Sequence, residues 1–522
     1  MARDRGEKQL GWYRRWLDGI ERVGNRLPHP IALFGLLAVG VVVLSAICAA
    51  AKVSATGELV SGGELKQTTV EVVSLLTRDG LAYMLSQAVH NFTSYAPLGM
   101  VLVSMLGVGV AEQSGLMGAL LKRTVQITPP KFITPVVVFL GVLSNVASDA
   151  GYVVLIPLGA MVFRACGRHP MAGLAAAFCG VSGGFSANLL VGMLDPMLAG
   201  ITQAAVSILD PNYQVAVMGN YYFLFASTFL ITLLGTVVTD RVVEPRLRAL
   251  EGESGEAEDL SLTTLTARER VGLRRAGWTA VFFVLLIVVA CIPEHSFLRN
   301  GNGSLLGRPA SPLMDGIVVL IALLFFLPAV AYGRTVGTLK NHRQVCDAMA
   351  SAMSTMGSFL ALAFVSAQFI QYFNYTKLGT IVALKGAELL QNAKIGLIPL
   401  MVLFVLFTAI MNLFLGSSSA KWSVLAPVFV PMFMVLGYSP ELCQLAYRIG
   451  DSVTNIITPM MTYFAVIVVF AQRYDDRAGI GTITATMLPY SVCFFVGWTL
   501  MLVVWLALGW PIGLGTPLTY PA

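Results

Sequence analysis

The sequence is short of charge. Of its 522 residues, 12% are charged and 56% are hydrophobic, and the mean hydropathy is +0.75. Soluble domains carry about twice that charged fraction, so the composition excludes an ordinary soluble protein. Many apolar stretches come close to the ~20 residues that a helix needs to cross a bilayer. Because a helix satisfies its own backbone hydrogen bonds in lipid, we expect an all-α polytopic membrane protein.

Cysteine and histidine are few and scattered. The seven cysteines form no CxxC pair, and most lie in apolar segments, which is typical of small core residues. The five histidines lie far apart, with no HExxH pattern or Cys/His cluster to indicate zinc, and we expect no resident cofactor. The net charge of +6 comes mostly from segments between the expected spans, so it indicates no nucleic-acid partner.

The N-terminal segment lacks the pattern of a cleaved signal peptide. Residues 1–28 mix seven Lys and Arg with four Asp and Glu, whereas a signal peptide begins with a short basic region. Trp12 and Trp16 flank a pair of arginines in this segment. We therefore expect a cytoplasmic amphipathic helix that lies on the inner leaflet.

Nine apolar segments have the length of a membrane crossing. They cover about 29–51, 94–121, 171–208, 218–240, 277–293, 313–332, 347–374, 440–471 and 484–509. Two further segments, 131–166 and 395–437, are too long for one span, and small and polar residues interrupt the middle of each. These two segments predict re-entrant hairpins, which enter and leave the membrane on the same side.

The basic residues set the expected orientation. With a cytoplasmic N-terminus, 24 of the 34 Lys and Arg fall in inside segments and 8 in outside loops, which fits the positive-inside rule. A first transmembrane half (29–240) is then joined to a second half (277–509) by a cytoplasmic linker (241–276), and a tail (510–522) lies in the periplasm. The linker sequence TARERVGLRRAG predicts a short capped helix.

The two halves share an internal repeat. Residues 148–182 align with 418–452 at an offset of 270, without gaps and with eleven identities in 35 positions. The shared proline and glycine positions are Pro157/Pro427, Gly167/Gly437, Pro170/Pro440 and Gly180/Gly450. The first copy starts from the cytoplasm and the second from outside, so we expect an inverted repeat. In many secondary transporters, paired discontinuous segments of such repeats form the binding site.

Polar residues gather at the hairpin tips and in the crossing after each hairpin. The tips read SNVASDAG (144–151) and NLFLGSSSAKW (412–422). In the next crossings, GVSGGFSANLLVGMLDP (180–196) predicts an unwound middle, and RIGDSVTNIITPMM (448–461) predicts a polar helix face that ends in a break at Thr458–Pro459. An ionisable residue at mid-membrane costs at least ~3 kcal/mol, which favours a functional role.

These side chains suit an organic anion and a hard monovalent cation. Arg448 and the serines of the second tip (Ser417, Ser418 and Ser419, the serine tip) suit a carboxylate, and Trp422 offers a face to an aromatic ring. Lys421 is left out of the site, because its long side chain can extend to the outer surface. Alternatives stay open: Arg448 and Asp451 can form a structural ion pair, and Asp149 and Asp195 can cap half-helices. Glu112 fits a proton carrier and a helix-packing contact equally well.

Other protein classes fit less well. GVSGG (180–184) matches GxSxG, but it lacks the strand–turn–helix context and His/Asp pair of a hydrolase. Asp195 and Asp451 could form an intramembrane aspartyl-protease dyad, but Arg448 would keep Asp451 ionised instead of sharing a proton. No repeated filter motif indicates a channel. The sequence therefore predicts a transporter and not an enzyme.

Long stretches of the chain resemble the p-aminobenzoyl-glutamate transporter (AbgT) family. They are APLGMVLVSMLGVGVAEQSGL (96–116), SDAGYVVLIPL (148–158), GFSANLLVGMLDP (184–196), GSSSAKWSVLAPVFVPM (416–432) and YRIGDSVTNIITPMMTYF (447–464). The chain looks most similar to the MtrF-like antimetabolite efflux pumps of Gram-negative bacteria. This resemblance implies an inner-membrane homodimer with nine transmembrane helices and two hairpins per protomer. It also implies substrate-path positions at Asp195, Ser419, Trp422, Pro440, Arg448, Asp451 and Pro459, and a sodium site at Asn412 and Asp451.

Together, the patterns and the resemblance predict a cation-coupled secondary transporter of aromatic organic anions in the bacterial inner membrane. Efflux of sulfonamide-type antimetabolites and p-aminobenzoic-acid-like compounds is expected; import of p-aminobenzoyl-glutamate is the alternative, and the coupling ion is Na⁺ or H⁺. The expected substrate-binding residues are Asp195, Ser417, Ser418, Ser419, Trp422, Arg448 and Pro459. The expected cation-binding residues are Asn412, Asp451, Asn145, Asp149 and Asn188, with Na⁺ at Asn412 and Asp451.

Overall fold

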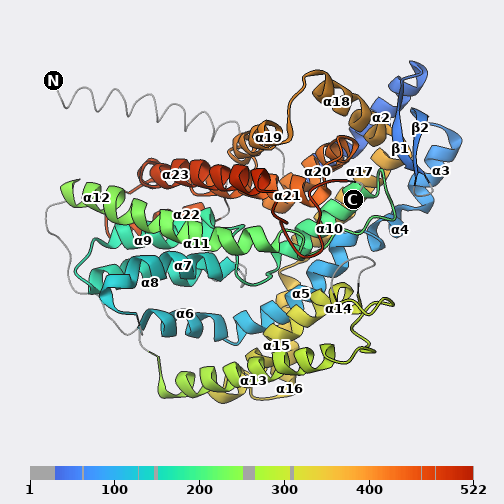
Figure 1. Cartoon of the computed structure of the whole chain (residues 1–522). Helices are drawn as coiled ribbons and strands as arrows, with labels where there is room; N and C mark the ends of the chain where they lie inside the picture. The colour runs from blue at the N-terminus through green and yellow to red at the C-terminus, as the bar shows by residue number, and fades with distance from the viewer. Residues whose placement is uncertain are drawn as a thin grey trace, which may run out of the picture.

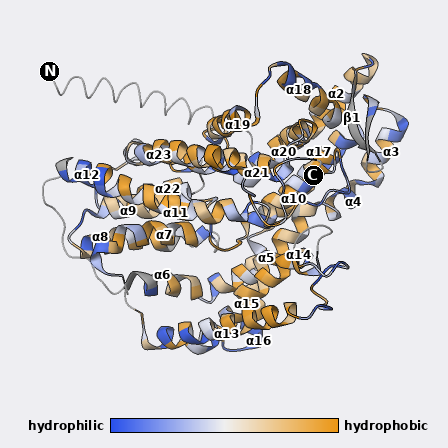
Figure 2. Cartoon of the chain, in the orientation of Figure 1, coloured by the Kyte–Doolittle hydropathy of each residue, from blue (hydrophilic) through white to orange (hydrophobic). Residues whose placement is uncertain are grey.

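The computed structural model consists mostly of helices (Figure 1). It describes residues 30–61, 64–126, 128–145, 151–250, 265–305, 311–459, 461, 463–476 and 478–520. The helices are apolar along most of their length (Figure 2), as expected for segments that pack against lipid and one another. The expected amphipathic helix at 1–28 and Asp149 of the first hairpin tip lie outside the described residues.

Six described helices are long and apolar enough to cross a membrane. They are α2 (Pro30–Ala50), α11 (Tyr221–Val238, continued by η5, Thr239–Val243, and α12, Glu244–Leu250), α13 (Ala267–Cys291), α15 (Ile317–Val336), α20 (Ser418–Val435) and α23 (Ile480–Ala507). A bent pair, α16 (His342–Ser354) and α17 (Gly357–Tyr375), gives a seventh candidate. The chain is thus a mostly helical membrane protein.

Three of the expected crossings fall outside this count because each is interrupted. The second expected crossing divides into α5 (Ala96–Gln113) and α6 (Leu116–Gln126). In the third, α9 (Pro170–Phe178) runs into a π-helical turn, η4 (Cys179–Gly183), and α10 (Leu194–Val206) starts after an irregular stretch. Near the C-terminus, α21 (Pro440–Asn455) is separated from α22 (Phe464–Gln472). The predicted unwound middle and the predicted break at Thr458–Pro459 are both confirmed.

The expected hairpins are each built from two helices and a tip. In the first, α7 (Ile133–Ser144) follows a short 3-10 turn, η1 (Pro130–Phe132), and the chain returns through η3 (Gly151–Leu155) and α8 (Ile156–Ala165). In the second, α19 (Leu397–Asn412) leads through a five-residue tip (413–417) into α20. Asn145, after the end of α7, donates to the Gly184 carbonyl in the break that follows, and Thr458 donates to the Leu413 carbonyl of the second tip.

The expectation of an all-α chain is wrong in one place. β1 (Ser54–Ser61) and β2 (Glu64–Glu71) form an antiparallel hairpin in the segment expected as a loop. Outside lipid, strands can pair without burying an edge, and the Thr- and Val-rich run TTVEVV favours them. Four helices also lie in or beside segments expected as loops: α3 (Arg78–Ser86), α4 (Ala88–Thr93), α14 (Pro312–Asp315) and α18 (Leu378–Asn392).

The helix expected in the linker is longer than predicted. A capping box between Thr266 and Glu269 starts α13, as the sequence indicates, but the helix continues without a break to Cys291. The predicted cap is therefore confirmed, while the predicted short helix is the first turns of a candidate membrane span. No proline or glycine pair interrupts the run between the basic start and the apolar remainder, so nothing local ends the helix.

The internal repeat is visible in the backbone. Gly167 and Gly437 both adopt left-handed conformations, with φ of +70° and +83°, where glycine avoids the strain of a Cβ. The next residue in each copy donates its N–H to the carbonyl five residues earlier, at 2.8 Å in the first copy and 2.9 Å in the second. Pro170 and Pro440 then occupy the first helical position of α9 and α21.

The glycines at 180 and 450 hold equivalent close contacts. A Cβ on Gly180 would collide with the carbonyl of Val138 in α7, and a Cβ on Gly450 would collide with the side chain of Thr408 in α19. Val138 and Thr408 are themselves 270 residues apart. Small residues let membrane helices approach closely. In both copies a glycine therefore allows close packing, of η4 against α7 in the first copy and of α21 against α19 in the second.

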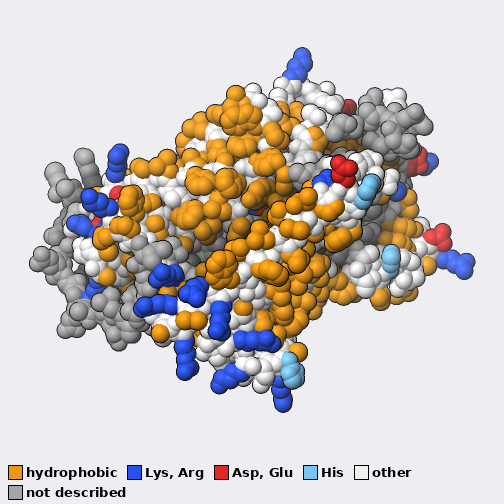
Figure 3. Space-filling view, turned by 60° about the horizontal axis from the view of Figure 1, so that its bottom comes forward, with side chains coloured by type: hydrophobic (Ala, Val, Ile, Leu, Met, Phe, Trp, Pro, Cys, Tyr) orange, Lys and Arg blue, Asp and Glu red, His pale blue; other side chains and the backbone are white. Residues whose placement is uncertain are grey.

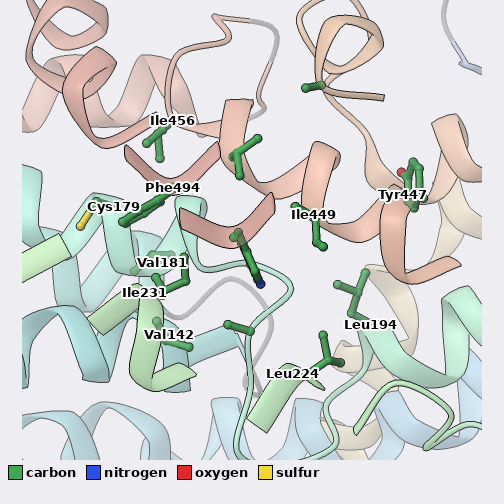
Figure 4. Close-up of a cluster of buried hydrophobic side chains, with 14 of the residues drawn as sticks. Val142, Cys179, Val181, Leu194, Leu224, Ile231, Tyr447, Ile449, Ile456 and Phe494 are labelled. Carbon is green, nitrogen blue, oxygen red and sulfur yellow. The ribbon is translucent and has the colours of Figure 1, made fainter. Parts of the chain in front are cut away.

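The core joins both halves around the breaks. Figure 4 shows Cys179 of the first half beside Phe494 of the second, with Val142 and Ile456 in the same cluster of buried side chains. Gly183 lies against the Phe494 ring, which a Cβ would approach to 2.7 Å. The two broken crossings therefore meet in a densely packed interior.

The surface has a broad apolar area and a basic end. Figure 3 shows hydrophobic side chains over much of one face, with Lys and Arg gathered toward one side. The exposed basic residues at the adjoining ends of α13, α15 and α16 are Arg268, Arg270, Arg274, Arg275, Arg334, Lys340 and Arg343. All of them belong to segments that the sequence analysis expects inside.

Candidate functional site

The candidate site lies where the second hairpin tip meets α21 and the start of α10. Two ion pairs are buried there. Arg448 Nη1 lies 2.7 Å from Asp195 Oδ1, and Lys421 Nζ lies 2.5 Å from Asp451 Oδ1. No side chain of the four exceeds 6% exposure. An unpaired charge in such a place is very costly, and each pair balances its own cation with its own carboxylate.

Arg448 does not pair with Asp451, although the two residues are one turn apart on α21. Arg448 reaches across to α10, and Asp451 faces α19 and α20. The alternative of a structural Arg448–Asp451 pair is therefore wrong, because each residue meets an oppositely charged partner on another element. The aspartyl dyad is not formed either, since Asp195 and Asp451 each bind a separate cation.

Asp195 links the first broken crossing to this pair. Its second oxygen, Oδ2, accepts a hydrogen bond of 2.8 Å from the Gly192 N–H, immediately before α10 begins. A carboxylate at a helix N-terminus is favoured by the helix dipole. Asp195 thus combines the half-helix cap that the sequence left open as an alternative with an ion pair to Arg448 that the sequence did not predict.

Lys421 does not lie where its sequence context predicts. It is fully buried and does not extend to the outer surface. Its ammonium donates to Asn412 Oδ1 and Asp451 Oδ1, and the Leu415 carbonyl lies 3.4 Å away. A lysine can remain inside because these oxygens replace its hydration and Asp451 balances its charge.

Asn412 joins the last turn of α19 to the last turns of α21. Its amide nitrogen donates to the Asp451 carbonyl at 2.6 Å, to Thr454 Oγ1 at 2.9 Å and to Asn455 Oδ1 at 2.8 Å. The structure therefore brings Asn412 and Asp451 together, as predicted. Their side-chain oxygens, however, face the ammonium of Lys421.

The three serines of the tip have different surroundings. Ser417 is exposed, and its hydroxyl caps α20 by accepting from the Ala420 N–H. Ser418 is buried, and its carbonyl accepts a hydrogen bond of 2.6 Å from the Tyr447 hydroxyl. Ser419 is half-buried. The tip is thus tied to α21 through Tyr447, a residue that the sequence analysis did not include.

Trp422 is fully buried, and its polar and aromatic groups are used within the protein. Its ring stacks on Tyr447 with centroids 4.4 Å apart, and its Nε1–H donates to Thr202 Oγ1 at 2.9 Å. Thr202 in turn donates to Gln444 Oε1 at 2.6 Å. In this conformation, the Tyr447 ring covers a face of the Trp422 ring that was predicted to contact the substrate.

The other expected cation ligands lie apart from Asn412 and Asp451. Asn145 donates from its amide to the Gly184 carbonyl at 3.3 Å, at the end of the first hairpin's α7. Asn188 lines a small cavity with Asp195 and Tyr221. The side-chain oxygens of Asn145 and Asn188 are buried without a hydrogen-bond partner among the described residues. Pro459 is half-buried beyond α21.

A larger cavity of about 790 Å³ lies at the other end of α10 and α21. Its wall includes Gln203 and the buried carboxylate of Glu441, which accepts a hydrogen bond of 2.9 Å from the Tyr213 hydroxyl. This cavity shares Val217 and Met218 with the small cavity that reaches Asp195. Cavity space therefore reaches Asp195 from this side, whereas Ser418 and Lys421 of the second hairpin are buried.

Comparison with known proteins identifies the family. The sequence model of the AbgT putative transporter family matches residues 15–520. The chain belongs to this family. It is 37% identical to the p-aminobenzoyl-glutamate transport protein of Escherichia coli K12 over 509 residues, which cover 97% of this chain and 96% of that protein. The AbgT-family assignment makes the chain a transporter and not an enzyme.

Two solved structures of high similarity agree with the fold. The MtrF structure from Neisseria gonorrhoeae, described as illuminating a class of antimetabolite efflux pumps, has a TM-score of 0.89 and 44% identity, and covers 97% of this chain and 100% of that one. The YdaH transporter of Alcanivorax borkumensis, described as having an unusual topology, has a TM-score of 0.85 and 45% identity, and covers 93% and 100%. This AbgT-family chain therefore has the architecture of characterised family members.

Three residues of the site were missed by the sequence analysis: Lys421, Tyr447 and Thr202. Lys421 carried a usable signal, because it is an ionisable residue inside an apolar segment, and such residues usually pair with one another. Two bases and three acids stood in the candidate segments. Tyr447 and Thr202 carried none, since an aromatic or a threonine on an apolar helix is ordinary core.

Proposed function

We propose that this AbgT-family chain is a cation-coupled secondary transporter that exports aromatic organic anions, such as sulfonamide-type antimetabolites and p-aminobenzoic-acid-like compounds. The observation that carries this proposal is the buried guanidinium of Arg448. One of its nitrogens binds Asp195, while Nε has no hydrogen-bond partner among the described residues. A guanidinium presents several donors in a fixed plane that matches a carboxylate, so Arg448 keeps donors for a substrate anion.

The direction of export rests on likeness to the MtrF structure, whose description names antimetabolite efflux pumps. Import of p-aminobenzoyl-glutamate is the second candidate, because the Escherichia coli relative is named for transport of that compound. Both functions use an aromatic carboxylate or a related anion, so the same arginine serves either one.

The proposal includes nine membrane crossings, two re-entrant hairpins, and an inner-membrane homodimer with a cytoplasmic N-terminus and a periplasmic C-terminus. The two halves (29–240 and 277–509) and the linker (241–276) follow from the same topology. The exposed basic residues at the ends of α13, α15 and α16 support this orientation. The repeat's equivalent turns and glycine contacts support an inverted pair of hairpins.

Counterflow in proteoliposomes tests the proposal. Labelled p-aminobenzoate, p-aminobenzoyl-glutamate and a sulfonamide are each measured under an imposed Na⁺ or pH gradient, with p-aminobenzamide as the uncharged analogue of p-aminobenzoate. We expect the acid to be transported and the amide to compete weakly, with the difference lost in Arg448→Gln. Arg343→Gln, on the exposed surface at the start of α16, is the matched control. Equal handling of acid and amide by the unchanged protein would contradict the role of Arg448.

A further inference from the structure

The Lys421 ammonium occupies a position built like a cation site. Three oxygens of different kinds surround it: the Asn412 amide oxygen, the Asp451 carboxylate and, at 3.4 Å, the Leu415 carbonyl. They come from the end of α19, the tip of the second hairpin and α21. Side-chain oxygens combined with an irregular backbone carbonyl are the ligands that transporters commonly offer to Na⁺.

These oxygens are held in place without the help of Lys421. The two hydrogens of the Asn412 amide nitrogen face three acceptors on α21 within hydrogen-bond distance, which fixes the opposite side of the amide, Oδ1, toward the ammonium. Asp451 has a second oxygen, Oδ2, that is buried with no hydrogen-bond partner among the described residues. If the ammonium left, an oriented amide oxygen and a buried carboxylate would remain.

The site can balance one cation at a time. Asp451 is its single acidic group among the described residues in contact with Lys421, and the nearby Arg448 is already paired with Asp195. Tyr447 adds only a hydroxyl 3.4 Å from Asp451 Oδ1 and a ring whose centroid lies 5.8 Å from Lys421 Nζ. Two cations beside one carboxylate would leave an uncompensated buried charge.

We propose that Lys421 is a tethered competitor of the coupling cation: its ammonium and a monovalent alkali cation alternate at the Asn412–Asp451 position. This inference rests on the proposed cation-coupled transport and names the residue that controls access to the cation site. Lys421 lies in the first turn of α20, so its withdrawal also removes the links from this helix start to Asn412 of α19 and Asp451 of α21, while Tyr447 still holds Ser418. Cation binding and movement of the serine tip are thereby linked.

Thermal unfolding of the purified full chain in detergent tests this inference. NaCl replaces choline chloride at constant ionic strength, and the Na⁺ concentration at half-maximal stabilisation is compared between the unchanged protein and Lys421→Met. If the ammonium leaves the site free about a tenth of the time, its removal improves the apparent affinity about tenfold. We expect Lys421→Met to be less stable without Na⁺. It should regain stability at a Na⁺ concentration about tenfold lower than the unchanged protein requires.

Two further variants make the test specific. Lys421→Gln retains an amide donor to Asp451 and fills the space, so it keeps the comparison possible if Lys421→Met does not fold; it should show the same shift toward lower Na⁺. Lys421→Met/Asp451→Leu removes both charges and should lose the Na⁺ response. An unchanged Na⁺ midpoint, or no response, in Lys421→Met and Lys421→Gln would overturn the inference and leave a purely structural ion pair.

Failure of this inference is distinguishable from failure of the proposed function. The Na⁺ titration contains no substrate, so a lowered midpoint in Lys421→Met supports the competitor role even if counterflow of aromatic anions fails. Conversely, counterflow of p-aminobenzoate together with an unchanged midpoint rejects the role of Lys421 and keeps the transporter proposal.

Discussion

The two copies of the repeat share a backbone but not a chemistry. Gly167 and Gly437 make the same left-handed turn, and Gly180 and Gly450 make equivalent close contacts. The charged residues of the second copy, however, have apolar counterparts 270 residues earlier. Lys421, Arg448 and Asp451 correspond to Gly151, Phe178 and Val181.

This difference separates architecture from function. The proline and glycine positions that the two copies share place a tip and a helix break in each half, because these residues act on the backbone directly. The side chains that fill these places are free to differ. The first copy supplies a packed apolar frame, and the second copy supplies Lys421, Arg448 and Asp451. The fourth charge, Asp195, lies outside both copies, at the start of α10.

The largest expected effect comes from removing a charge in the second copy. Asp451→Ala leaves the Lys421 ammonium buried without its counter-ion, which costs about 3–5 kcal/mol, and we expect it to abolish transport. Val181→Ala, at the equivalent position of the first copy, removes only buried methyl groups and should cost roughly 0.5–3 kcal/mol. Thermal unfolding in detergent and counterflow measure both. Equal loss of transport at equal stability would remove the distinction between the copies.

The shared glycine contacts predict similar effects in both copies. Gly180→Ala and Gly450→Ala each place a Cβ against a neighbouring helix, and overpacking of this kind costs about 1–3 kcal/mol. Gly277→Ala in α13 is the control, because no atom lies within 4 Å of the added Cβ. A stability loss in one copy and none in the other would show that the contacts are not equivalent.

The Trp422 contact predicts a smaller effect and separates packing from recognition. Trp422→Phe keeps the ring stack with Tyr447 and loses one hydrogen bond to Thr202, which still donates to Gln444, so a loss of about 0.5–1.5 kcal/mol is expected. Thr202→Val leaves the buried Trp422 N–H without an acceptor and should cost about 1–3 kcal/mol. If Trp422 also contacts the substrate ring, counterflow of aromatic anions survives in Trp422→Phe and fails in Trp422→Ala. Equal transport by the two Trp422 variants, at equal stability, would assign this tryptophan to packing alone.

The proposed membrane orientation can be tested with cysteine substitutions at exposed positions, where no change in stability is expected. In a background that lacks the exposed native thiol of Cys346, Asn302→Cys and Arg268→Cys both place a thiol on the surface. With the proposed orientation, an impermeant thiol reagent added to intact cells labels position 302 and spares position 268. The reverse pattern would show that both copies have the opposite orientation in the membrane to the one proposed.

The structure also shows where sequence reasoning stops. The capping box at Thr266 and the break at Thr458–Pro459 were predicted, because a cap or a proline acts within a few residues. The β-hairpin at 54–71 was missed, since the hydropathy of a segment outside the apolar runs does not separate a loop from a short strand pair. Lys421 was misplaced because its charge and long side chain fit the membrane surface as well as the interior.

The sequence by itself determined the membrane class, the helix breaks and the repeat, because hydropathy and the backbone preferences of proline and glycine act locally. Only the tertiary structure decided the partners. Arg448 meets Asp195 across 253 residues and Trp422 meets Thr202 across 220, while Lys421 turns inward to Asp451. Such pairs depend on which helix faces meet in space, and a buried charge is stable only beside the oxygen atoms that this packing brings to it.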